Sequence, residues 1–84
     1  MQIIRTKYFP ATNNRSERIK ASTDNYAIKQ ASIICNYDNR LTCEKNHIKA
    51  ARLLKDKMEW NGEWFGGHSK EGMIFVNKVI EYRL

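Results

Sequence analysis

Residues 42–59, TCEKNHIKAARLLKDKME, are the one stretch of this sequence with the periodicity of an amphipathic helix. Thr42 has the side chain of an N-cap, and Glu44 suits the positive end of the helix dipole. Residues at three- and four-residue steps predict a buried stripe, formed by His47, Ala50, Ala51, Leu54 and Met58. We expect the helix to end near Asn61-Gly62, because glycine readily adopts a left-handed cap conformation.

Alternating apolar and polar residues predict strands on both sides of this helix. These strands are expected at residues 2–9, 17–23, 31–37, 63–66 and 73–77. Pro10, Asp24-Asn25 and Asp38-Asn39 mark the breaks in the first half, and a glycine loop at 67–72 joins the last two strands. The sequence therefore predicts an α+β fold, in which an antiparallel sheet of about five strands (β-β-β-α-β-β) carries one helix on one face.

Length and composition predict one domain spanning residues 1–84, because 84 residues support a single core and 42% of them are hydrophobic. The opening MQIIRTKYFP lacks the apolar segment of a signal peptide, and no apolar run approaches the roughly 20 residues of a membrane helix. Two cysteines are too few for a disulfide scaffold. We therefore expect a cytoplasmic protein that does not bind membranes.

Positive charge is concentrated in the first part of the chain. The net charge is +6, and residues 1–30 hold six basic against two acidic groups, a net of +4. If the first two strands form a hairpin that pairs Arg5 with Lys20 and Lys7 with Arg18, four cations share one face. Like charges placed opposite each other destabilise a sheet, so an anionic partner would explain the cluster. The other interpretation is a solvated surface that keeps a small protein in solution.

Cations close to stackable rings are typical of nucleic-acid-binding surfaces. The candidate nucleic-acid-binding residues are Arg5, Lys7, Tyr8, Arg15, Arg18 and Lys20. The basic side chains would pair with phosphates and Tyr8 would stack on a base. No sequence signature of a known nucleic-acid-binding module specifies DNA or RNA, so the expected partner is nucleic acid or a nucleoprotein complex.

Aromatic residues near the glycines suggest a second contact surface. Trp64, Phe65 and His68 are the candidate partner-binding residues, because exposed aromatic side chains beside a loop often mark protein contacts. The other interpretation is that Trp60, Trp64 and Phe65 are core residues that cover the end of the helix.

Metal binding and catalysis find little support in the sequence. The spacing of the metal candidates matches no common zinc module; these are Cys35, Cys43, His47 and His68. Cys43 and His47 have no orienting carboxylate or oxyanion site that can be placed with them, and the glycines do not form a phosphate-binding loop. We expect no metal, no cofactor, no small-molecule ligand and no enzyme activity.

Two stretches of the sequence carry a resemblance, TKYFPATNNRSERIKA (6–21) and HIKAARLLKDKMEWNGEWFGGHSKEGMIFV (47–76). They resemble a family of small proteins of bacteriophages and integrating mobile elements, although Ser16 and Glu17 stand where the family pattern has Gly and Ser. The resemblance implies a mobile-element protein in a bacterial host cell. The leading hypothesis is a non-catalytic accessory protein that binds nucleic acid or a nucleoprotein through its basic N-terminal face. The alternative is an anti-defence inhibitor, of the anti-CRISPR or anti-restriction type, that binds a host protein effector.

Overall fold

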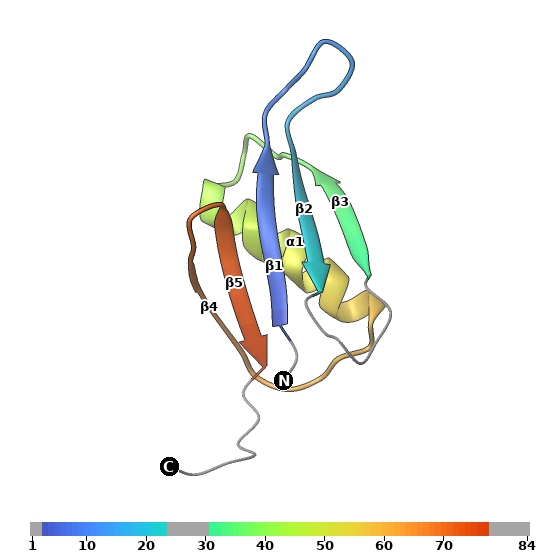
Figure 1. Ribbon diagram of the computed structural model, residues 1–84, viewed down its shortest axis with the longest axis vertical. Coiled ribbons are helices and arrows are strands. Elements are labelled where there is room, and N and C mark those ends of the chain that lie inside the picture. Colours follow the sequence, from blue (N-terminus) through green and yellow to red (C-terminus); the bar gives the residue numbers. More distant parts are fainter. Residues whose placement is uncertain (1–2, 24–30, 78–84) are drawn as a thin grey trace.

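The computed structural model describes residues 3–23 and 31–77 (Figure 1). Its elements in chain order are β1 (Ile3–Phe9), β2 (Arg18–Thr23), β3 (Ser32–Asn36), α1 (Cys43–Lys57), β4 (Trp64–His68) and β5 (Gly72–Asn77). The predicted turn at Asp24-Asn25 and the predicted strand residue Gln2 lie outside the described ranges. Each predicted element is present with shifted ends.

The five strands form one antiparallel sheet in the order β3-β2-β1-β5-β4. The first three strands make the expected meander, and β4 and β5 make a hairpin. That hairpin joins the sheet through β5, which lies beside β1 although the two strands are at opposite ends of the chain. The predicted α+β architecture of about five strands and one helix is confirmed.

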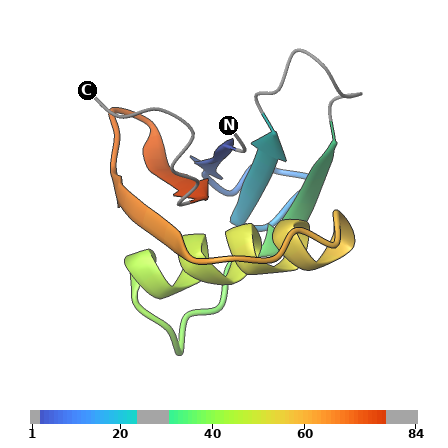
Figure 2. The same cartoon turned by 90° about the horizontal axis from the view of Figure 1, so that it is seen from below.

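The hydrophobic core lies between the sheet and α1, which packs along one face of the strands (Figure 2). Ile4, Ile19 and Leu54 are its largest fully buried side chains. Burying one such side chain contributes about 1.5–3 kcal/mol. No element of the described chain covers the opposite face of the sheet, which we call the open face.

Both ends of α1 are capped by local hydrogen bonds. Thr42 is the N-cap as predicted, because its Oγ1 accepts the backbone N–H of Lys45 at 3.1 Å. The predicted end near Asn61-Gly62 is wrong. The chain leaves the helix after Lys57 and turns at Glu59, which has a φ of 56°. Trp60 N–H then donates to Lys55 O at 3.0 Å, and this early turn buries the Trp60 ring in the core.

The predicted β1–β2 register is wrong by two residues. Arg5 lies opposite Ser22, and Lys7 lies opposite Lys20. A two-residue slip leaves every side chain on its predicted face, so alternation alone does not distinguish the two registers. The eight-residue connection at 10–17 does not fix the register either.

The hairpin of β4 and β5 is longer than predicted. Gly66 lies in a strand as predicted, but Gly67 and His68 also belong to β4 and Gly72 begins β5, so only residues 69–71 form the turn. A Cβ on Gly66 would collide with the side chain of Phe75 on the neighbouring strand. The ring of Phe75 thus lies over the bare backbone of Gly66, and this packing explains why a glycine occupies that position of the strand.

Candidate functional site

The open face gathers the basic residues of the first hairpin. Strand alternation places Arg5 and Lys7 of β1 on this face, together with Arg18 and Lys20 of β2. Lys7 and Lys20 are directly opposite each other across the two strands. We call these four residues the cationic cluster.

Phe9 lies within this cluster and holds two of its members. The ring centroid of Phe9 is 5.3 Å from Nζ of Lys7 and 5.1 Å from Cζ of Arg18. Contacts of this kind contribute roughly 0.5–1 kcal/mol each at exposed sites. The ring of Phe9 therefore attracts an ammonium and a guanidinium group to the same place on the open face.

A hollow of about 460 Å³ opens over three members of the cluster, Arg5, Lys7 and Lys20. Its other wall is the turn between β4 and β5, which contributes Lys70 and Glu71. Glu71 Oε2 lies 3.9 Å from Nζ of Lys7, and both side chains are more than half exposed, so this pair is weak. Among the described residues that line the hollow, Glu71 is the one carboxylate. The hollow has a positive lining to which a distant part of the sequence adds a further cation.

Sequence reasoning missed Lys70. This residue is distant from the cationic cluster in sequence and comes close to it because Lys7 lies opposite Gly72 in the β1–β5 pair. That approach needs a glycine, since a Cβ at position 72 would collide with the carbonyl group of Thr6. The glycine at position 72 is the one sequence feature that points to a close approach of two strands. A single sequence does not reveal which strand it approaches.

The structure separates Tyr8 from the rest of the predicted nucleic-acid-binding set. Its side chain lies on the helix side of the sheet, where its ring meets Tyr37 edge-on at a centroid distance of 5.7 Å. Burial raises the pKa of Tyr8, and the neighbouring Glu17 raises it further. Phe9, one residue later, is the aromatic side chain on the cationic face.

Arg15 lies outside the sheet. It is exposed in the connection between β1 and β2, which extends beyond the ends of the strands (Figure 1). The tip is a turn in which Thr12 N–H donates to Arg15 O at 2.8 Å, and Arg15 N–H donates to Thr12 Oγ1 at 3.2 Å. Arg15 therefore adds a cation beyond the end of the sheet, three residues before Arg18 in the chain.

The predicted partner-binding residues do not form one surface, because β4 alternates them between faces. Trp64 and His68 are on the helix side, where Trp64 stacks on Trp60 at a centroid distance of 5.8 Å. His68 Nε2 lies 2.8 Å from a carboxylate oxygen of Glu44 at the start of α1. Phe65 is on the open face and is 55% exposed.

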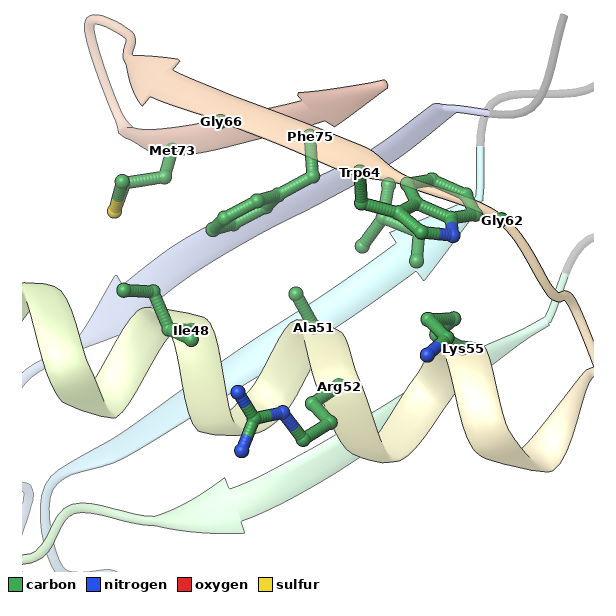
Figure 3. Close-up of a pocket in the computed structure, with 10 residues that line it drawn as sticks. Ile48, Ala51, Arg52, Lys55, Gly62, Trp64, Gly66, Met73 and Phe75 are labelled. Carbon is green, nitrogen blue, oxygen red and sulfur yellow. The ribbon is translucent and has the colours of Figure 1, made fainter. Parts of the chain in front are cut away.

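A groove of about 370 Å³ runs between α1 and β4 (Figure 3). It exists because no Cα atom of β4 comes within 8 Å of one in α1, and Gly66 has no side chain to fill the space. Trp64 and Phe75 line the groove on the sheet side. The helix contributes Arg52 and Lys55, so the groove has an apolar floor and a basic rim.

The four metal candidates are dispersed. Cys43 is exposed at the helix start, Cys35 is half-buried on β3, and His68 is hydrogen-bonded to Glu44. His47 is only 4% exposed, and its Nδ1 lies 2.7 Å from Thr6 Oγ1. Among residues 3–23 and 31–77, no three Cys, His, Asp or Glu side chains are grouped so that they could hold a metal ion.

Comparison of the chain with protein-family models, curated proteins and solved structures finds no match. The resemblance to small phage and mobile-element proteins therefore stays a prediction. Within the described ranges, α1 is the single helix, and it has neither the length nor the apolar composition to cross a bilayer. Any functional conclusion consequently depends on the geometry of the open face and the groove.

Proposed function

We propose that this protein binds nucleic acid, without catalysis, through the cationic cluster on the open face. The proposal rests on one observation. Lys7 and Lys20 lie directly opposite each other, with Arg5 and Arg18 on the same two strands, and no described element covers this face. Phosphate oxygens are the ligands that such a surface accepts, since each accepts hydrogen bonds from ammonium and guanidinium groups.

The opposition of Lys7 and Lys20 in the described sheet favours an anionic ligand. Like charges directly opposite each other destabilise a strand pair by roughly 0.2–1 kcal/mol. The carboxylate of Glu71 does little to offset this, because its contact with Lys7 is long and solvated. A phosphate in the hollow would lie against several cations at once, with Phe9 already holding Lys7 and Arg18 in place.

The resemblance of residues 6–21 and 47–76 to phage and mobile-element proteins supports the same proposal. The resemblance implies either the handling of nucleic acid or the blocking of a host defence, and the cationic cluster favours the first of these. The predicted residues Arg5, Lys7, Arg18 and Lys20 form the central contact, and Arg15 extends it along the hairpin. Tyr8 has no direct part in this proposal, because its ring packs on the helix side.

A salt series with labelled DNA and RNA tests the proposal. Four phosphate contacts give a slope of log affinity against log salt of about −3. We expect the variant Arg5→Gln/Lys7→Gln/Arg18→Gln/Lys20→Gln to lose binding while it retains its circular dichroism spectrum. Equal affinities of this variant and the wild type would contradict the proposal.

The helix offers a matched control for net charge. Four exposed cations of α1 are changed to glutamine; these are Lys45, Lys49, Arg52 and Lys57. Both quadruple variants have a formal net charge of +2, four less than the +6 of the native chain. If binding depends on the position of the cations, only the open-face variant loses it. Equal losses would indicate attraction to overall charge alone.

The groove supports a second candidate function, inhibition of a host-defence protein. Its apolar floor beside Trp64 and Phe75, with Arg52 and Lys55 at the rim, suits an apolar side chain flanked by carboxylates. Trp60 and Trp64 lie on this side, so an acidic-apolar peptide in the groove would change tryptophan fluorescence. Binding that changes this fluorescence and varies little with salt would favour the protein target over nucleic acid.

A further inference from the structure

We infer that the nucleic acid on the open face is single-stranded, with an unpaired base stacked on Phe65. This inference rests on the proposed function and adds the class of nucleic acid to it. It starts from an apolar row beside the cationic cluster. Ile3 lies opposite Val76, and Val76 lies opposite Phe65, so three apolar side chains cross β1, β5 and β4 in one line.

The apolar row is accessible from the open face. Ile3 and Val76 are half-buried, and Phe65 at the edge strand is 55% exposed. Gly67 lies two residues further along β4 on the same face, and among the described residues nothing comes within 4 Å of where its Cβ would be. Among residues 3–23 and 31–77, the backbone beside the ring is therefore open, and the exposed part of the ring offers a surface on which a planar base can lie.

The cationic cluster and the apolar row adjoin. Ile74 on the open face lies between Arg5 of β1 and Gly67 of β4, so the boundary between charged and apolar side chains follows the β1–β5 pair. Phosphates over the cluster leave the attached bases directed toward the row. The open face thus presents in one plane the two chemistries of a nucleotide, a charged backbone and an apolar ring.

Only an unpaired strand uses both halves of this face. In a duplex the flat surfaces of the bases are stacked inside, so the apolar row would face a polar sugar-phosphate backbone and gain nothing. A single strand turns its bases out, and each base stacked on an aromatic side chain contributes roughly a fivefold to hundredfold gain in affinity. The exposed ring of Phe65 is therefore better explained by single-stranded than by double-stranded nucleic acid.

The test compares three oligonucleotides of equal length and sequence: a single strand, the same strand with abasic sites, and the duplex. The abasic strand keeps the phosphates and removes the stacking surface. We expect the wild-type protein to bind the intact single strand at least about fivefold more tightly than the abasic strand. Phe65→Ala should abolish this difference and leave the affinity for the abasic strand unchanged.

Two further variants separate stacking from folding. Phe65→Tyr keeps a ring and should restore the preference for bases. Leu53→Ala removes a large apolar side chain that is 43% exposed on the helix and should change nothing. Equal binding of intact and abasic strands, or tighter binding of the duplex, would overturn the single-strand inference while the proposed function stands. The absence of binding to all three at low salt would overturn both.

Discussion

The buried hydroxyl of Thr6 connects the sheet to α1. Its Oγ1 lies 2.7 Å from Nδ1 of His47 and accepts the N–H of Met73 at 3.0 Å. Thr6 is 3% exposed and His47 is 4% exposed, so bulk water does not reach these groups. Thr6→Val keeps the shape of the side chain and removes the hydroxyl. We expect this substitution to be among the most destabilising single changes in the sheet.

The size of the effect follows from the groups that lose their partner. Leaving a buried donor or acceptor unsatisfied costs about 1–3 kcal/mol. The Met73 N–H and the His47 imidazole are both affected, which predicts a loss of about 2–6 kcal/mol in the free energy of unfolding. A domain of this length has a total of about 4–13 kcal/mol. The melting temperature should consequently fall by at least about 10 °C.

Urea unfolding measured by tryptophan fluorescence tests this expectation. Thr6→Ser is the matched variant, because it keeps the hydroxyl and loses one methyl group, worth about 1 kcal/mol. The order of stability should be wild type, then Thr6→Ser, then Thr6→Val. If Thr6→Val unfolds within about 0.5 kcal/mol of the wild type, the typical effect of a neutral surface change, or is more stable than Thr6→Ser, the hydroxyl does not connect helix and sheet as described.

Three further predictions concern other positions. Burial lowers the pKa of His47 below its ordinary 6.5, so below about pH 6.5 the unfolded chain takes up a proton that the folded chain does not. The free energy of unfolding should therefore be highest above about pH 6.5 and should fall below it. Urea titrations at pH 7.5 and 5 should show this fall, and it should be smaller in His47→Gln. Gly66→Ala should lower the melting temperature, because its Cβ meets the Phe75 ring, with a cost of about 1–3 kcal/mol. Gly67→Ala, in open space, should be neutral or stabilising by about 0.5 kcal/mol; equal effects of the two changes would contradict the packing described. Thr42→Ala should cost about 1 kcal/mol in urea unfolding by removing the helix N-cap, and Thr42→Ser should restore it.

The amino-acid pattern was sufficient to predict the elements and the faces of the strands. Alternation in IIRTKYF puts Arg5 and Lys7 on one side and Ile4 and Thr6 on the other. In the structure Arg5 and Lys7 are exposed, and Ile4 and Thr6 are buried. The same pattern places Tyr8 on the face opposite the cations, so its closeness to them in sequence does not make it part of their surface. Strand geometry outweighs proximity in sequence, since adjacent residues point to opposite faces.

The helix end illustrates a different limit. Gly62 was expected to end α1 because glycine tolerates a positive φ, but the chain turns at Glu59 instead. The gain from burying Trp60 outweighs the roughly 1 kcal/mol that a left-handed conformation costs a residue with a side chain. Local preference predicted where a turn is easiest, and packing of one aromatic ring decided where it occurs.

The sequence by itself determined the α+β class, the single helix and a basic first hairpin, because periodicity and charge are local properties of the chain. Only the tertiary structure decided that Lys7 faces Lys20, that Lys70 borders the same hollow, and that Phe65 is separated from Trp64. These outcomes depend on the β1–β2 register and on the pairing of β1 with β5, which lies at the other end of the chain. The local pattern of a strand does not encode a partner at the other end of the chain, and it does not distinguish registers that differ by two residues.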